Sequence, residues 1–150
     1  MRPIARSVEF KPWDLDDDQV RITFKGDLAY AALENGCYQL ARPITCVLDG
    51  IDWFTIPAGF VTDFLSTPRW LWWWVDRFDP KWIFGACAHD YLYDQRCPVN
   101  CSRLDADCML RDSGATTGAS HINRILIYAG VRTFGGKYWR AQTGLPRGSA

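Results

Sequence analysis

The stretch FGACAHDYLYDQ, residues 84–95, places a histidine next to an aspartate inside an apolar, helix-like segment. The chain holds 2 histidines in 150 residues, so an imidazole here is a scarce chemical group. On a helix, His89 and Tyr93 lie four residues apart and share a face, while Asp90 points about 100° away. One helix can therefore present an imidazole, a carboxylate and a phenol to the same cleft.

A second segment, SRLDAD at residues 102–107, supplies the other half of this candidate site. If its helix packs antiparallel to the first through the tight Cys97-Pro98 turn, Asp105 can reach the ring of His89. A carboxylate on an imidazole N–H fixes the tautomer and makes the ring a better general base. We therefore predict a contact between His89 and Asp105 at the centre of the site.

The same residues also have a purely structural interpretation. In it, His89 donates to a backbone carbonyl or to Asp105, and Asp90 caps the loop at Thr62 or Ser66. Buried polar groups need such partners whatever the function, and hydrogen-bond networks imitate active sites. The sequence leaves the two interpretations open.

The pattern AC-x-HD-x-x-Y, followed by an aspartate on the next helix, resembles the catalytic helix pair of the phospholipase A2 fold. The resemblance implies that His89 activates a water, that Asp105 orients His89, and that Asp90 ligates calcium. That family has a glycine-rich calcium loop, for which GFVTDFLSTP is the only substitute, through Asp63 or backbone carbonyls. The supporting residues of such a site are Tyr93, Thr62, Ser66 and Arg103.

Four motifs, taken in order, resemble an uncharacterised family of small proteins encoded by tailed phages and prophages. They are GF-x-TD-x-x-S-x-PR at Gly59 to Arg69, HD-x-LY at His89 to Tyr93, R-x-x-AD at Arg103 to Asp107 and AGVRTFG at Ala129 to Gly135. This resemblance implies a phage context and supplies no reaction. It implies a protein partner, either a phage structural subunit or a host factor, and a location in the host cytoplasm or the virion.

A cluster of tryptophans marks a candidate contact surface. Trp70, Trp72, Trp73 and Trp74 occupy four of five consecutive positions. They cannot all face inward from one short element, so we expect exposed aromatic surface that meets a partner protein or a lipid interface. We therefore predict a phage accessory or virion structural protein that makes contacts through this tryptophan-rich segment. The alternative is a calcium-assisted esterase of the phospholipase A2 type.

Composition excludes some other classes. The 17 basic and 17 acidic residues give a formal net charge of zero, without the basic footprint of a nucleic-acid binder. We interpret Arg132, Lys137 and Arg140 as a solvated helix face. The first ten residues lack the apolar run of a secretory signal, and the apolar run at 70–75 is too short to cross a bilayer.

The 6 cysteines suggest a metal site only weakly. Cys97, Cys101 and Cys108 can be combined with His89 into a zinc site, but no C-x2-C pair typical of structural zinc occurs. We therefore expect reduced core thiols. The cofactor stays open, with calcium favoured over zinc.

The elements that must position these residues form one expected domain of the α+β class. Short β-rich runs over about residues 20–57, with Asp49-Gly50 between two apolar stretches, predict a small antiparallel sheet. Helical spacing over about residues 81–135 predicts three helices, the second ended near residue 112 by Ser113-Gly114. An acidic N-terminal segment and a frayed C-terminal tail flank this domain.

Overall fold

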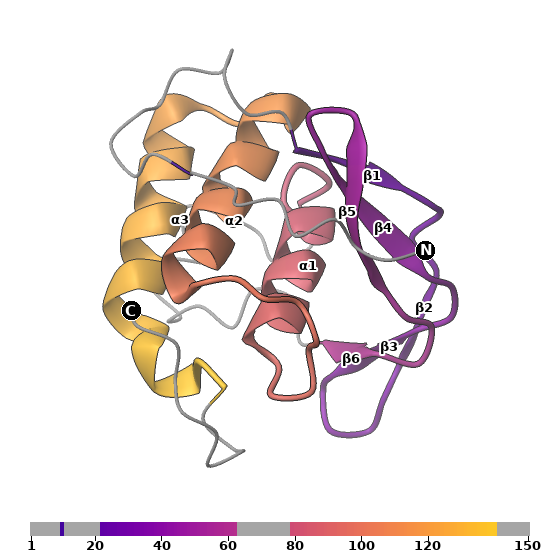
Figure 1. Cartoon of the computed structure of the whole chain (residues 1–150). Helices are drawn as coiled ribbons and strands as arrows, with labels where there is room; N and C mark the ends of the chain where they lie inside the picture. The colour runs from indigo at the N-terminus through magenta and orange to yellow at the C-terminus, as the bar shows by residue number, and fades with distance from the viewer. Residues whose placement is uncertain (1–9, 11–21, 63–78, 141–150) are drawn as a thin grey trace.

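Strands come first and helices last in the computed structural model of the chain (Figure 1), which describes Phe10 and residues 22–62 and 79–140. The strands are β1 (Ile22–Lys25), β2 (Tyr30–Ala32), β3 (Tyr38–Leu40), β4 (Ile44–Leu48), β5 (Ile51–Ile56) and β6 (Val61–Thr62). The helices are α1 (Ile83–Tyr93), α2 (Arg103–Thr117), α3 (His121–Phe134) and the short 3-10 helix η2 (Gly136–Tyr138). The α+β class is therefore confirmed.

The strands form two antiparallel sheets rather than the single sheet that was predicted. One has the order β1-β4-β5 and the other the order β2-β3-β6. The chain passes from one sheet to the other after β1, after β3 and after β5. Between β3 and β4, Pro43 lacks the N–H that would continue a ladder. The segment after Gly59 was predicted as a loop, but its Val61 and Thr62 form β6 and pair with β3. Thr62 is thereby held beside the helices.

The hairpin predicted at Asp49-Gly50 is present between β4 and β5. Both turn residues have positive φ, 50° at Asp49 and 76° at Gly50. This backbone matches the twist of the strands that it joins, which is why Asp-Gly is favoured there. The flanking residues Leu48 and Ile51 face each other across the ladder.

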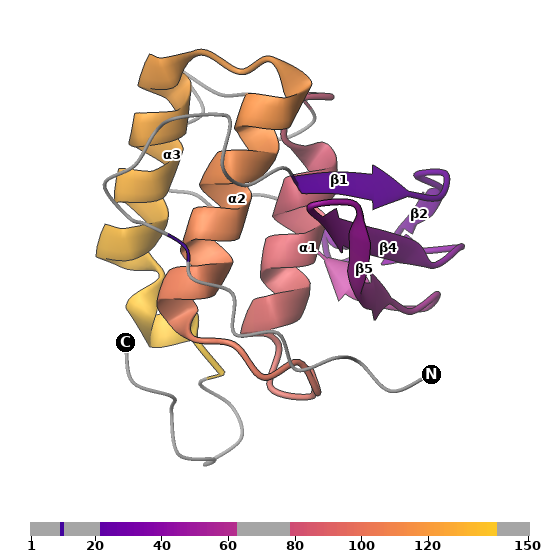
Figure 2. The same ribbon diagram turned by 45° about the horizontal axis from the view of Figure 1, so that its top comes forward.

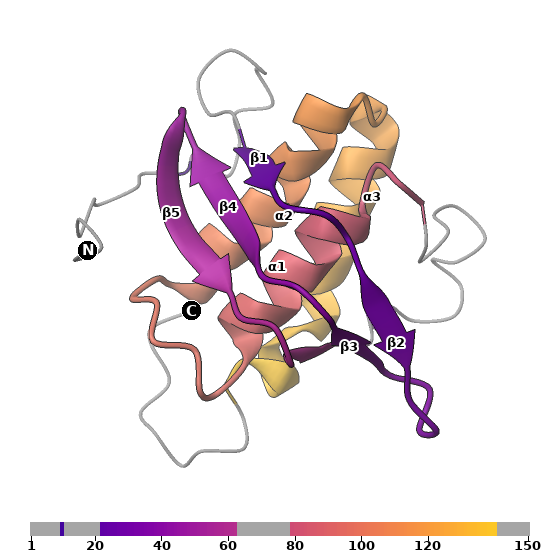
Figure 3. The same cartoon turned by 90° about the vertical axis from the view of Figure 1, so that its right-hand side faces the viewer.

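The helices lie in a row with α2 between α1 and α3, and the strands cover the other side of α1 (Figure 2). Seen from the sheet side, β4 and β5 lie in front of α1 (Figure 3). The helix α1 is therefore enclosed on both sides, and nine of its residues are buried. A polar side chain on α1 must find its partner within the protein.

Two glycines allow α1 and α2 to approach closely. A Cβ on Gly85 of α1 would meet the hydroxyl of Ser113, and a Cβ on Gly114 of α2 would meet the ring of Trp82. The prediction that Ser113-Gly114 ends the second helix was wrong. The helix continues to Thr117 because Gly114 serves this contact, and Gly118 ends it in the left-handed region at φ 87°.

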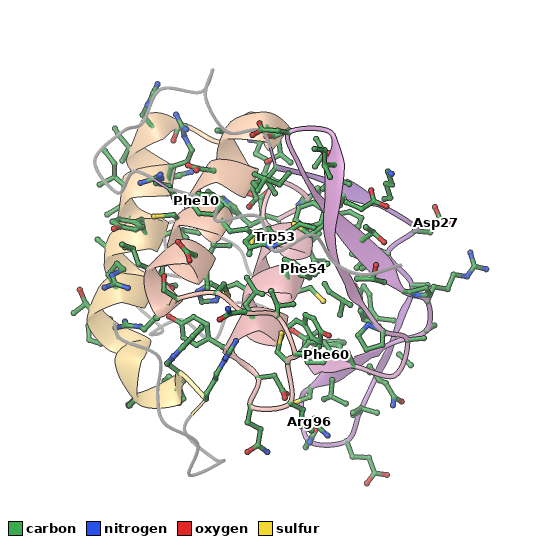
Figure 4. All side chains as sticks on the ribbon, viewed as in Figure 1. Phe10, Asp27, Trp53, Phe54, Phe60 and Arg96 are labelled. Atoms are coloured by element: carbon green, nitrogen blue, oxygen red, sulfur yellow. The ribbon has the colours of Figure 1, made fainter. Side chains whose placement is uncertain are left out.

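Aromatic rings fill the space between the strands and α1. Phe54 of β5 stacks on Tyr91 of α1 with ring centroids 5.8 Å apart, and Phe60 meets the same ring edge-on at 5.3 Å. Figure 4 labels both rings, with Phe60 below Phe54 in that view. The layer fixes the rotation of α1, and with it the directions of His89 and Asp90.

The third helix lies within the region that was predicted to be helical, and Gly135 follows its last residue, Phe134. The hydroxyl of Ser120 caps its N-terminus. Its inward face carries Arg124, Ile127 and Val131, while Ile122 and Ile125 are exposed. Within the described residues, none of the helices is long and apolar enough to span a bilayer.

Candidate functional site

The two polar faces of α1 diverge as its spacing predicted. His89 and Tyr93 both turn toward α2, with ring centroids 4.2 Å apart. Asp90 turns toward the sheet, where its Oδ2 accepts a 2.6 Å hydrogen bond from the hydroxyl of Thr62. The predicted tie between Asp90 and Thr62 is therefore confirmed, and it joins α1 to β6.

The predicted partner of His89 was wrong by two residues. Asp105 is the third residue of α2, and its carboxylate accepts a 3.0 Å hydrogen bond from the backbone N–H of Ser102. The hydroxyl of Ser102 accepts from the N–H of Asp105 in return, which completes a capping box. Asp107 stands about 200° further round the helix and faces α1. His89 Nε2 lies 2.8 Å from Asp107 Oδ1.

The carboxylate of Asp107 is the centre of a buried network. Its side chain is 0% exposed. Tyr93 donates its hydroxyl to Oδ1 at 2.6 Å, so this oxygen serves both residues of α1. The other oxygen, Oδ2, accepts from Arg132 Nη1 at 2.9 Å, and Arg103 Nε lies 3.8 Å from it. Side chains from all three helices thus converge on one carboxylate.

Arg103 connects this network to the end of α3. Its Nε donates to the hydroxyl of Tyr93 at 3.1 Å. Its Nη2 donates to the carbonyls of Val131 and Arg132 at 2.8 and 2.6 Å. The last carbonyls of a helix lack partners within the helix, so a guanidinium that binds them stabilises its end.

Electrostatics keep Asp107 ionised. Burial alone raises the pKa of its carboxyl, but the hydrogen bonds from His89, Tyr93 and Arg132 outweigh burial and lower that pKa. Burial raises the pKa of Tyr93, and the charge of Asp107 beside it raises it further. Tyr93 therefore stays a hydrogen-bond donor, and Asp107 stays an acceptor.

These charges determine the tautomer of His89. An ionised carboxylate only accepts hydrogen bonds, so Nε2 of His89 carries a proton and donates it toward Asp107. In a neutral imidazole the lone pair then lies on Nδ1. Nδ1 has no hydrogen bond to the described part of the chain. The arrangement is that of an oriented base, although His89 is only 7% exposed.

The predicted metal ligands are less complete. The predicted calcium ligands are Asp90 and Asp63. Asp90 is among the described residues, and Asp63 lies outside them. No group of three or more histidines, cysteines, aspartates or glutamates that could hold a metal occurs in residues 22–62 and 79–140. Calcium takes six to eight oxygen ligands, so the described residues alone do not form the predicted site.

Several other predicted residues also fall outside the described residues. They are Ser66 and the tryptophans Trp70, Trp72, Trp73 and Trp74. All six cysteines are described and are free thiols, with Cys108 buried and Cys101 partly buried. Burial raises the pKa of Cys101 to about 12 and that of Cys108 to about 11, so neither is a ready thiolate ligand.

Sequence reasoning placed Asp107 in the SRLDAD segment of the site but assigned the contact with His89 to Asp105, and it missed Arg132 as a member of the site. Ser102-x-x-Asp105 is itself a capping-box pattern, and this signal assigns Asp105 to the start of the helix. Arg103 and Asp107 then remain as a pair four residues apart. Arg132 was interpreted as a solvated residue, and only the packing of α3 on α2 brings it to Asp107.

A comparison with known families gives one match. The family described as "protein of unknown function (DUF1353)" matches residues 38–131. The chain belongs to this family. The DUF1353 match includes His89, Asp90, Tyr93, Arg103 and Asp107 and ends one residue before Arg132. No curated protein and no solved structure matches the chain.

Proposed function

We propose that this member of the DUF1353 family is a hydrolase of ester bonds in which His89 is the general base and Asp107 orients it. The observation that carries the proposal is the 2.8 Å separation of His89 Nε2 and the buried Asp107 Oδ1. This pairing holds Nε2 in its protonated form and directs basicity to Nδ1. A carboxylate on the far nitrogen of a histidine is the usual support of a general base.

The proposed reaction needs only a water and an ester. Nδ1 of His89 takes a proton from the water while the oxygen of that water attacks the carbonyl carbon of the ester. Asp107 stabilises the imidazolium that forms, because its negative charge lies on the opposite ring nitrogen. The tetrahedral intermediate collapses, the bond to the leaving alkoxide breaks, and the proton passes from Nδ1 to that alkoxide. General base catalysis of this kind contributes roughly 10²- to 10⁴-fold.

The resemblance to the phospholipase A2 fold supports the same roles, with Asp107 in the place first given to Asp105. It also proposes calcium at Asp90 and Asp63. No step above passes through calcium, because Asp90 is the one proposed ligand whose contacts are described. Titration calorimetry at millimolar calcium tests the ligands directly. Heat that disappears in Asp90→Asn supports the calcium proposal, and no heat from the wild type refutes it.

The general-base proposal is tested on the full chain with p-nitrophenyl esters of short and long acyl chains and with phosphatidylcholine micelles. Each substrate is assayed with calcium and with a chelator. We expect His89→Gln to lower the rate at least roughly 100-fold. The matched control is His121→Gln, because His121 is exposed on α3 and bonds Arg124 instead, at 2.9 Å. It should retain the wild-type rate.

A purely structural role for His89 gives a different result. In that case the wild type hydrolyses none of the tested esters, or a folded His89→Gln protein hydrolyses them as fast as the wild type does. Either result refutes the hydrolase. Circular dichroism and thermal unfolding of each variant separate loss of folding from loss of chemistry.

We also propose a second function, supported by the phage resemblance and by Trp70, Trp72, Trp73 and Trp74. In it the chain is a phage accessory or virion component that contacts a phage subunit or host factor through the tryptophan-rich segment. It acts in the host cytoplasm or the particle. Replacing Trp72 and Trp73 by serine should then abolish assembly with that partner, measured by sedimentation and by association with purified particles. A monodisperse monomer that never associates with particles refutes this function.

A further inference from the structure

Arg132 is the residue through which α3 reaches the candidate site. It lies in the last turn of α3, and its Nη1 donates to Asp107 Oδ2 at 2.9 Å. Its side chain is 26% exposed, whereas that of Asp107 is 0% exposed. The side chain of Arg132 therefore meets solvent in part, while its Nη1 binds the buried carboxylate.

The two arginines near Asp107 do different things. Arg103 Nε is 3.8 Å from Oδ2, and its hydrogen bond goes to the hydroxyl of Tyr93 instead. Arg132 alone of the two donates a hydrogen bond to the carboxylate. A charged donor at hydrogen-bond distance restrains an oxygen far more than a charge 3.8 Å away that is bonded elsewhere.

This difference determines where Oδ1 points. Oδ1 must lie between His89 and Tyr93, and both oxygens turn together about the bond to the carboxylate carbon. With Oδ2 held by Arg132, this rotation is blocked. Without Arg132, we expect the charge of Arg103 to draw Oδ2 toward itself and to turn Oδ1 away from His89.

Arg132 is itself held by the same network. Arg103 Nη2 donates to the carbonyl of Arg132 at 2.6 Å and to that of Val131 at 2.8 Å. The backbone at Arg132 is therefore held to α2 by Arg103, which precedes Asp107 by four residues on that helix. The guanidinium approaches Asp107 from a defined direction.

We infer that Arg132 is a positioning residue, which holds the Asp107 carboxylate in the rotation that keeps its Oδ1 on His89 Nε2. Its consequence for catalysis rests on the proposed function, while its effect on the His89 hydrogen bond does not. The role belongs to a residue of the third helix whose hydrogen bond goes to Asp107 and not to His89.

The test is the Nε2–H signal of His89 in the full chain labelled with ¹⁵N at histidine. In the wild type we expect a downfield signal protected from exchange with water, as a hydrogen bond to a buried carboxylate requires. In Arg132→Gln this signal should move upfield or be lost by exchange. Arg132→Lys should restore it in part, because an ammonium donates to the carboxylate without the planar geometry of a guanidinium.

The matched control is Arg96→Gln. Arg96 lies at the edge of the molecule (Figure 4), 78% exposed and bonded to Asp94. Its replacement should leave the His89 signal unchanged. Guanidinium ions added to Arg132→Gly should recover the signal, because solvent reaches this site. In an active enzyme, Arg132→Gln should lower kcat/KM roughly 10- to 100-fold, which corresponds to one hydrogen bond to a charged group.

The outcomes separate the two proposals. An unchanged Nε2–H signal in a folded Arg132→Gln protein overturns the positioning role, whatever the activity. If Arg132→Gln does not fold, Arg132→Lys is measured in its place. A His89 Nε2–H signal identical to that of the wild type in the Arg132→Lys protein then overturns the positioning role. A displaced signal in a chain that hydrolyses no ester supports the positioning role and refutes the hydrolase.

Discussion

His89 on α1 and Asp107 on α2 are joined inside the protein by a 2.8 Å contact between Nε2 and Oδ1. The carboxylate of Asp107 has no contact with solvent, and it accepts hydrogen bonds from donors on α1 and α3. A buried carboxylate costs free energy unless it is paired and hydrogen-bonded. The contact between His89 and Asp107 therefore joins α1 to α2, and in the proposed hydrolase it also orients His89 as the general base.

Asp107→Asn and Asp105→Asn should differ strongly in stability. We expect Asp107→Asn to lower the free energy of unfolding by about 3–5 kcal/mol, because an amide nitrogen or a neutral oxygen then faces buried Arg103. Asp105→Asn should cost about 1 kcal/mol, the usual worth of a helix cap. Urea unfolding of both variants measures the difference. Equal losses would mean that Asp105 carries the buried contact instead.

The stabilisation by Asp107 should depend on pH in one direction. The pKa of Asp107 in the folded chain lies below its ordinary value of 3.8. A lowered pKa means that the carboxylate stabilises the fold fully above the ordinary value, and that this contribution is lost as the pH falls through the folded pKa. The difference in unfolding free energy between the wild type and Asp107→Asn should shrink below about pH 4. A constant difference down to about pH 3 would contradict this assignment.

Tyr93→Phe should destabilise the chain although only a hydroxyl is removed. That hydroxyl donates to Asp107 at 2.6 Å and accepts from Arg103 at 3.1 Å. We expect a loss of about 1–3 kcal/mol, because two buried groups lose a partner. The control is Tyr138→Phe, since Tyr138 is exposed and should change little. A double-mutant cycle with Asp107→Asn should show strong coupling, and additivity would mean that the two side chains act separately.

Gly114→Ala should destabilise the protein, against the usual order of helix propensities. Alanine is normally favoured over glycine in a helix by about 1 kcal/mol. Here a Cβ would meet the buried ring of Trp82, so we expect overpacking to cost about 1–3 kcal/mol instead. Thermal unfolding measures the sign. The penalty should diminish in a Trp82→Leu background, and a persistent penalty would locate its cause elsewhere.

Local patterns in the sequence predicted much of the fold. The turn at Asp49-Gly50 was found because its two positive φ angles depend on those two residues and their neighbours. The third helix was found because helical spacing and the glycine at position 135 that follows it are local signals. The end of α2 was missed because Gly114 lies against the ring of Trp82, a contact between residues 32 positions apart in the sequence.

The sequence by itself determined that an imidazole, a carboxylate and a phenol lie on one helix, because positions 89, 90 and 93 have fixed angles on any α-helix. Only the tertiary structure decided which partner His89 receives. Rotation of α2 about its own axis chooses between Asp105 and Asp107, and packing at Gly85 and Gly114 sets that rotation. The tertiary structure also brought Arg132 to the carboxylate of Asp107, since no local spacing relates residues 25 positions apart.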